Sequence, residues 1–171
     1  WMLNTGKTDA AKPYLESAER INPASKETQY VRGMYYRYLK QFGEAEKIFE
    51  VLSRESPNDI LSASNLAICL CESGDDKKKK RGVELAESIL QRTPKAAEAY
   101  ALLGWCYFKS GRIEDADKAL GQSLSGGQAT LDMAYYAARV LADKGKIEDA
   151  HKLLKATSGG KGPFVYRSDA L

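Results

Sequence analysis

The stretches GRIEDA at residues 111–116 and GKIEDA at residues 145–150 decide the fold, because they are nearly identical and lie 34 residues apart (145 − 111 = 34). The same interval carries Leu120 onto Leu154, so the match extends beyond the six residues. Self-similarity at a fixed period of about 20–50 residues is typical of repeat architectures, in which one small unit is stacked many times. The sequence therefore predicts a repeat array.

The same period continues toward the N-terminus with one interruption. Three positions in the first 25 residues recur 34 residues later, pairing Ala11 with Ala45, Leu15 with Phe49, and Pro23 with Pro57. The next proline, Pro94, follows Pro57 by 37 residues (94 − 57 = 37). We expect the three extra residues in the lysine-rich run after Gly74, as a solvated insertion between two helices.

Each period contains two segments with the apolar spacing of a helix. In the repeat that begins at residue 97, the two apolar faces consist of Tyr100, Leu103, Gly104 and Tyr107, and of Ile113, Ala116, Leu120 and Leu124. Spacings of three, four and about seven residues place side chains on one side of a helix. Gly111 lies between the two segments, where glycine suits the left-handed conformation that ends many helices. Small residues recur where the paired helices would cross, at Gly33, Ala67, Gly104 and Ala138 in first helices and at Ala45, Gly82, Ala116 and Ala150 in second helices.

These positions and the period resemble the tetratricopeptide repeat, whose pattern is W-x2-L-G-x2-Y, A-x3-F and P. The resemblance implies an all-α, right-handed solenoid of antiparallel helix pairs. It divides the chain into the C-terminal part of a truncated repeat (1–25), four repeats (26–59, 60–96 with the insertion, 97–130 and 131–162) and the start of a capping helix (163–171). Because the chain opens on Trp1 and not on methionine, we expect it to be a segment of a longer array.

The composition is unfavourable for catalysis and for metal binding. The 171 residues are 43% hydrophobic and 29% charged, with a single histidine, His151, and three cysteines. One histidine removes the commonest general base and metal ligand from almost every arrangement, and three cysteines cannot build a disulfide framework. We therefore expect no catalytic residue, no metal, no cofactor and no enzymatic activity. No run approaches the roughly 18 apolar residues of a membrane-spanning helix, so we expect no membrane insertion.

The net charge of +3 depends on one run, Lys77 to Arg81, which contributes +5 and without which the remainder would be −2 (3 − 5 = −2). The charge therefore does not favour nucleic acid as a partner. A short basic run can be a localisation signal or a phosphate-binding patch, but a solvated surface is the simpler interpretation. We interpret Cys69, Cys71 and Cys106 as buried free thiols that act as small apolar residues.

The resemblance implies that the first helix of each repeat lines a concave groove. Aromatic and apolar side chains surrounded by basic ones are typical of interaction sites. The residues that we predict to bind a partner are Tyr30, Met34, Arg37, Tyr38, Ile68, Trp105, Phe108, Lys109, Tyr135 and Arg139. The competing interpretation is that neighbouring helices bury most of these residues. The carboxylate clamp of one subtype is disfavoured, because Tyr30 and Met34 stand where that clamp has lysine and asparagine.

These observations predict a protein–protein interaction scaffold that binds a peptide or helix of a partner protein in an apolar and aromatic concave groove. One alternative is a docking or regulatory module of a larger enzyme whose catalytic part lies outside this segment. Another is weak self-association through the truncated N-terminal repeat. An RNA-binding helical repeat has a similar period, but the near-neutral charge and the uneven placement of basic residues argue against it.

Overall fold

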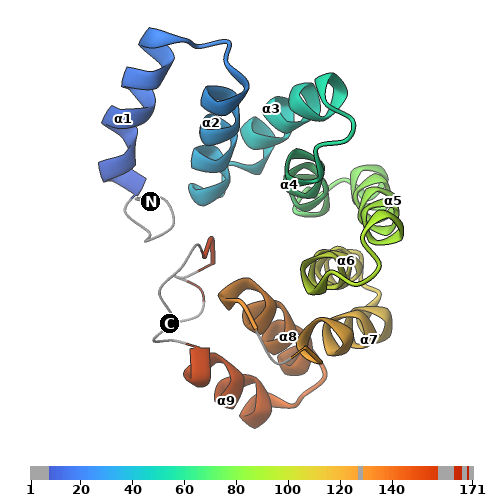
Figure 1. Ribbon diagram of the computed structural model, residues 1–171. Helices are drawn as coiled ribbons and strands as arrows, with labels where there is room; N and C mark the ends of the chain where they lie inside the picture. The colour runs from blue at the N-terminus through green and yellow to red at the C-terminus, as the bar shows by residue number, and fades with distance from the viewer. Residues whose placement is uncertain (1–7, 127–128, 158–163, 167–168, 170–171) are drawn as a thin grey trace.

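The computed structural model describes residues 8–126, 129–157, 164–166 and 169, which form nine α-helices and no β-strand. The helices are α1 (Thr8–Ile21), α2 (Lys26–Tyr38), α3 (Phe42–Glu55), α4 (Ile60–Cys71), α5 (Asp76–Arg92), α6 (Ala97–Lys109), α7 (Ile113–Leu124), α8 (Leu131–Asp143) and α9 (Ile147–Thr157). Figure 1 shows them following one another round a curve, with α2 and α8 facing each other across its inner side. The prediction of an all-α solenoid is confirmed.

Each predicted repeat contains one helix pair: α2 with α3, α4 with α5, α6 with α7, and α8 with α9. The first helix of a pair packs on its own partner and also on the first helix of the next repeat. The first helices α2, α4, α6 and α8 therefore form a continuous layer, which Figure 1 shows on the inner side of the curve. This layer positions the side chains that the sequence assigns to the groove.

Local signals set the ends of several helices. Four helices begin after a side chain that accepts hydrogen bonds from backbone N–H groups of the first turn, at Ser25, Asp59, Asp75 and Thr130. Such caps satisfy donors that have no partner inside the helix. Gly111 and Gly145, in the turns after α6 and α8, have a φ of 77°, where a side chain would be unfavourable. The role predicted for Gly111 is confirmed.

Small residues let the paired helices approach closely. All eight small residues predicted at the helix crossings are buried. A Cβ atom added to Gly33 would lie 2.8 Å from Cζ of Phe49, and one added to Gly82 would lie 2.5 Å from Sγ of Cys71. Because protein interiors are close-packed, neither position has room for a methyl group without movement of a neighbour. The Cys71 sulfur explains why glycine occupies a position where the other repeats have alanine.

The lysine-rich run is helical, which corrects the expectation of an inserted loop. Lys77–Arg81 lies in the first turns of α5, which is 17 residues long. Lys78 pairs with Glu46 at 2.8 Å, and Arg81 pairs with Glu50 at 2.7 Å, both on α3 of the preceding repeat. The extra residues therefore lengthen a helix. As a loop they would lose the Asp75 N-cap and the two ion pairs with α3.

The described part of the C-terminal segment also differs from the predicted capping helix. Val165 and Tyr166 form a turn, Asp169 lies in a short 3₁₀ turn, and the remaining residues of 163–171 apart from Phe164 lie outside the described residues. The side chains of Phe164, Val165 and Tyr166 are buried in the main hydrophobic core. Instead of extending the stack beyond α9, these side chains pack on the inner layer, where aromatic residues of α6 and α8 offer a larger apolar surface.

Candidate functional site

Aromatic side chains of α6 and α8 cluster on the inner layer of helices. The Trp105 ring centroid lies 4.4 Å from that of Tyr136 and 5.9 Å from that of Tyr135. Phe108, one turn along α6, stacks on Trp105 at 5.3 Å. We call this site, together with the polar side chains at its edge, the aromatic groove; it consists of Glu72, Trp105, Phe108, Lys109, Tyr135 and Tyr136.

Tyr166 of the C-terminal segment places its ring among three rings of the aromatic groove. It stacks on Tyr135 with the centroids 4.9 Å apart and the planes 9° from parallel. Its centroid lies 5.4 Å from that of Trp105 and 6.0 Å from that of Tyr136. Phe164 meets Tyr135 edge-on at 5.5 Å. Aromatic pairs at these separations stabilise a contact beyond the area that they bury.

Glu72, at the C-terminal end of α4, binds the polar end of Tyr166. Its Oε1 atom accepts hydrogen bonds from Trp105 Nε1 at 2.9 Å and from the Tyr166 hydroxyl at 2.6 Å. Its Oε2 atom pairs with Lys109 Nζ at 2.8 Å, and only 7% of the side chain is exposed. A buried carboxylate is tolerated when such donors replace water. Glu72 therefore links α4, α6 and the C-terminal segment.

The buried tyrosines of the site hold their protons firmly. Burial raises the pKa of Tyr166 well above its ordinary value, and the neighbouring Tyr136 and Glu72 act in the same direction. Burial likewise raises the pKa of Tyr136, with a further contribution from the Asp132 carboxylate. Both hydroxyls are therefore protonated at neutral pH, which makes Tyr166 a hydrogen-bond donor to Glu72.

A second contact ties the C-terminal segment to the first repeat. Lys40, in the turn after α2, forms an ion pair with Asp169. Its backbone has a φ of 57°, a left-handed conformation that is uncommon for a residue with a side chain. Gly111 and Gly145 occupy the corresponding turns of later repeats. The segment thus touches the inner layer at α4, α6 and α8 and also the turn that follows α2.

Five of the ten predicted partner-binding residues lie at or beside the aromatic groove: Trp105, Phe108, Lys109, Tyr135 and Arg139. Trp105 and Tyr135 are each only 2% exposed, and the rings packed on them include Tyr166 of the C-terminal segment. Lys109 lies 5.5 Å above the Trp105 ring, and Arg139 donates to the Tyr135 hydroxyl at 3.3 Å. The structure brings these residues together, with the segment Phe164–Tyr166 already in contact with them.

The other five, Tyr30, Met34, Arg37, Tyr38 and Ile68, lie toward the N-terminal half. Tyr30 packs edge-on against Phe49 of its own repeat at 5.8 Å. The Arg37 guanidinium donates to Asn65 at 2.5 Å and is buried, as are Tyr38 and Ile68. Met34 is half-buried against the core. For Arg37, Tyr38 and Ile68 the structure agrees with the competing interpretation that neighbouring helices bury them, whereas Tyr30 and Met34 remain partly exposed.

Glu72, Tyr136 and the segment Phe164–Tyr166 are absent from the set predicted from sequence. Glu72 occupies a position that the resemblance places on the groove, so its charge opposite Lys109 was an available signal. The Tyr166–Glu72 contact joins residues 94 positions apart. No periodic pattern relates those two positions, because the segment lies outside the repeats.

The remaining candidate chemistry has ordinary structural explanations. Cys69, Cys71 and Cys106 are free and buried as predicted, and burial raises the pKa of Cys69 to about 12. Within the described residues, no group of three or more His, Cys, Asp or Glu side chains is placed to hold a metal ion. Among the helices that the structure describes, none combines the length and apolarity needed to cross a membrane.

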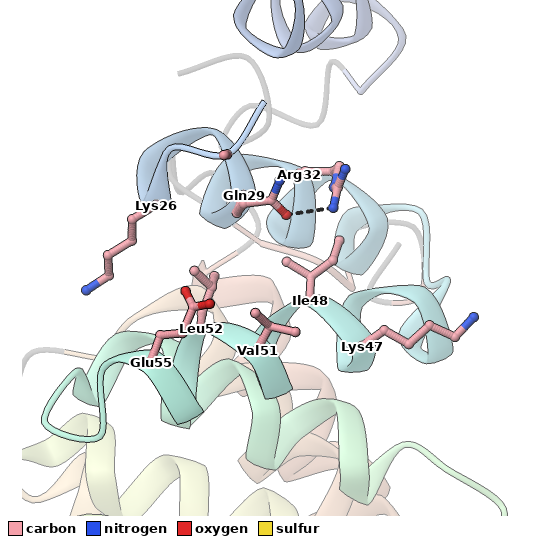
Figure 2. A pocket seen from close by; sticks show the side chains of 9 residues that line it. Lys26, Gln29, Arg32, Lys47, Ile48, Val51, Leu52 and Glu55 are labelled. Carbon is pink, nitrogen blue, oxygen red and sulfur yellow. Dashed lines mark hydrogen bonds between the residues drawn. The ribbon is translucent and has the colours of Figure 1, made fainter. Parts of the chain in front are cut away.

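A separate hollow of about 380 Å³ lies between α2 and α3, and Figure 2 shows the side chains around it. We call it the α2–α3 pocket; it is lined by Ala24, Lys26, Gln29, Arg32, Lys47, Ile48, Val51, Leu52 and Glu55. Aliphatic side chains of α3 form its floor and charged side chains form its rim. Lys26 pairs with Asp59 at 3.0 Å. Arg32 donates to Gln29 at 2.6 Å, as Figure 2 shows.

Comparison with solved structures identifies the architecture. TTC0263, a thermophilic tetratricopeptide-repeat protein of Thermus thermophilus, is similar over 91% of this chain and 84% of its own, with a TM-score of 0.75 and 19% identity. The chain has the tetratricopeptide-repeat fold. The resemblance predicted from the 34-residue period is therefore confirmed.

Two other solved structures are similar with lower TM-scores. This tetratricopeptide-repeat chain is similar to PilW, a type IV pilus biogenesis factor, over 87% of its own length and 68% of PilW (TM-score 0.64, 22% identity). It is also similar to a chain of the Cut9–Hcn1 hetero-tetramer of APC/C, over 90% of its own length and 29% of that chain (TM-score 0.68, 16% identity).

Sequence comparison matches part of the chain to a family. The family described as anaphase-promoting complex, cyclosome, subunit 3 matches residues 75–157, the span from α5 to α9. A comparison with curated proteins found no match. Stacked repeats of this type generally present extended concave surfaces to partners.

Proposed function

We propose that this chain is a non-catalytic scaffold that binds a short apolar and aromatic segment of a partner protein in the aromatic groove. The observation that carries the proposal is the packing of Phe164–Tyr166 on Trp105 and Tyr135. A peptide segment docked on the groove within one chain supports the capacity of that groove for a similar segment from another protein. Trp105, Phe108, Lys109, Tyr135 and Arg139 are the proposed contacts among the residues predicted from sequence.

The chain's own segment sets the condition that a partner must meet. An empty groove would expose Trp105 and Tyr135, so some segment is expected to cover them at all times. A tethered segment acts at an effective concentration of the order of millimolar, against which a partner competes. A partner therefore needs either a better fit than Phe164–Tyr166 or a second contact elsewhere on the solenoid.

The test uses the full chain carrying Phe164→Ala and Tyr166→Ala, which we call the acceptor. A fluorescent peptide of residues 162–171 is titrated into the acceptor and into the wild-type chain, and binding is followed by anisotropy. We expect saturable binding to the acceptor and at least about tenfold weaker binding to the wild type, whose own segment competes. Absence of saturable binding to a folded acceptor would contradict the proposal.

Matched variants locate the binding. Adding Trp105→Ala to the acceptor should weaken binding by about tenfold or more, because the ring forms one side of the site. Val51→Ala, in the α2–α3 pocket, should leave binding unchanged. Circular dichroism checks that each variant is folded. Should Trp105→Ala unfold the chain, Phe108→Ala removes a half-buried ring from the same site.

A further inference from the structure

The ring and the hydroxyl of Tyr166 contact different kinds of side chain. Its ring lies among Tyr135, Tyr136 and Trp105, whereas its hydroxyl donates to Glu72 at 2.6 Å. A purely apolar site would accept any ring of this size. A hydrogen-bonding group at the end of the site adds discrimination, because a ligand without the hydroxyl leaves a buried acceptor short of a partner.

We propose that the aromatic groove selects its partner segment by an unmodified tyrosine, recognised through Glu72. The ligand class is a peptide with an aromatic residue, one apolar residue and then tyrosine, the order in which Phe164, Val165 and Tyr166 occur in this chain. This inference rests on the proposed function and names the chemistry of the segment that the groove takes.

The surroundings of Glu72 make it a specific acceptor for a neutral donor. Oε1 receives Trp105 Nε1 and the Tyr166 hydroxyl, and Oε2 is occupied by Lys109. Lys109 pairs with Oε2, so the ligand needs to bring no positive charge, only a hydrogen-bond donor for the negatively charged Oε1. A phenylalanine ring fits among the aromatic side chains but supplies no donor, which should weaken binding about tenfold or more.

Phosphorylation of the tyrosine should exclude the ligand. A phosphate brings about −1.5 to −2 charges and three further oxygen atoms. It would have to enter the place where the hydroxyl oxygen now lies 2.6 Å from a carboxylate oxygen that is almost fully buried. Like charges at that distance, beside a side chain that is only 7% exposed, repel strongly. The groove therefore distinguishes tyrosine from phosphotyrosine by the sign of the charge that Glu72 presents.

Two further contacts fix the register of the ligand. Phe164 lies edge-on to Tyr135, two residues before the tyrosine, and Asp169 pairs with Lys40, three residues after it (169 − 166 = 3). Lys40 adopts a left-handed conformation where the corresponding turns have Gly111 and Gly145. Retention of a lysine in such a turn has a physical reason if its side chain is needed, here for the acidic group of the segment.

Three peptides test the selectivity on the acceptor: residues 162–171 as they stand, the same peptide with Tyr166→Phe, and the same peptide with Tyr166 phosphorylated. We expect the first to bind, the second to bind about tenfold or more weakly, and the third to show no saturable binding. Equal binding of all three would overturn the inference and leave the proposed function standing. Binding of none would overturn the proposed function and the inference with it.

A matched pair of variants assigns the selectivity to one carboxylate. Adding Glu72→Gln to the acceptor should reduce the preference for tyrosine over phosphotyrosine by about tenfold or more, because the repelling charge is gone. Glu87 is the control, since its Oε1 atom also accepts a tyrosine hydroxyl, that of Tyr107, at 2.9 Å. Glu87→Gln should leave the selectivity unchanged; an equal effect of both variants would overturn the assignment.

A second measurement needs no acceptor and covers the case in which that variant fails to fold. In the otherwise unmodified chain, Glu72→Gln, Tyr166→Phe and the double variant form a thermodynamic cycle on the unfolding equilibrium. We expect the two single effects to be coupled by about tenfold in that equilibrium constant. Additive effects would show that Glu72 does not recognise the hydroxyl and would overturn the inference.

Discussion

The aromatic groove and the α2–α3 pocket are two sites between helices of the same solenoid, and they differ in the side chains that surround their apolar centres. The groove is built of aromatic rings from α6 and α8 and is covered by Phe164–Tyr166. The pocket has an aliphatic floor that includes Ile48 and Leu52, with a charged rim (Figure 2). Both sites are formed by helices that belong to the same kind of repeat, a pair of packed helices.

The difference teaches that apolar surface is not enough to order a segment on a solenoid. In the groove, Glu72 accepts a hydrogen bond from the Tyr166 hydroxyl of the C-terminal segment. In the pocket, Lys26 already pairs with Asp59 and Arg32 with Glu19, at 3.0 and 3.7 Å. Two charged side chains of the pocket thus pair with neighbouring segments, although Nε of Arg32 is buried without a hydrogen-bond partner, whereas Glu72 accepts the hydroxyl of Tyr166 from the C-terminal segment. The groove therefore combines aromatic rings with a carboxylate that accepts a hydrogen bond from the covering segment.

The largest expected effect is that of Trp105→Ala on stability. The ring packs against Phe108, Tyr135, Tyr136 and Tyr166, so its removal leaves a large cavity. We expect the free energy of unfolding in urea to fall by about 3–5 kcal/mol. Trp105→Phe, which keeps a ring, should cost less. A loss below about 1 kcal/mol for Trp105→Ala would show that the groove is not part of the core.

A matched pair of tyrosine variants compares the groove with an exposed position on α1. Tyr166 in the groove is 4% exposed, whereas Tyr14 on α1, beside the N-terminal repeat, is 67% exposed. Tyr166→Ala should lower the free energy of unfolding by about 2–3 kcal/mol, because a buried ring and a hydrogen bond are lost. Tyr14→Ala should change it by less than about 0.5 kcal/mol. Equal effects in urea unfolding would mean that the C-terminal segment adds no stability.

Alkaline pH should destabilise the groove. The pKa values of Tyr136 and Tyr166 are raised by burial, so their contribution is complete below the ordinary tyrosine pKa of about 10 and is lost as pH rises beyond it. Each such tyrosine should lower the free energy of unfolding by about 1.4 kcal/mol per pH unit in that range. Urea unfolding at pH 9, 10 and 11 measures the slope. Tyr166→Phe should reduce the slope, and an unchanged slope would contradict the burial of its hydroxyl.

The smallest expected effect is in the α2–α3 pocket. Arg32→Ala removes a partly exposed pairing with Glu19 on α1 and a hydrogen bond to Gln29. Exposed pairs of this kind contribute little, so the free energy of unfolding should fall by less than about 1 kcal/mol. The same urea titration applies. A loss above about 2 kcal/mol would show that the pocket rim holds α1 in place and would remove the contrast with the groove.

The repeat units were predictable because their signals are local and periodic. The match between residues 111–116 and 145–150 covers a turn and the start of a second helix, and Gly111 and Gly145 have the same left-handed backbone. The helix crossings followed from small residues at fixed spacing. The lysine-rich run was misjudged as a loop, because its insertion relative to the period was visible, whereas its pairing with Glu46 and Glu50 on α3 was not.

The candidate site was only partly predictable, because the repeat pattern names the positions that face inward but not what covers them. Trp105 and Tyr135 were identified as groove residues, yet both contact Tyr166, which lies outside the periodic part of the chain. Tyr30 occupies a groove position in the pattern, but its ring turns to Phe49 of its own repeat. The direction in which a side chain points depends on the residues packed around it, and the spacing of residues in the sequence does not specify those contacts.

The sequence by itself determined the all-α repeat architecture, the turns and the close helix crossings, since each depends on residues within one 34-residue unit or its neighbour. Tertiary structure alone decided that the C-terminal segment lies on the inner layer and that Glu72 accepts its tyrosine. The physical reason is distance along the chain. Residues 94 positions apart meet only after the solenoid has curved, and the meeting is favoured by burial and a hydrogen bond that exist in no single repeat.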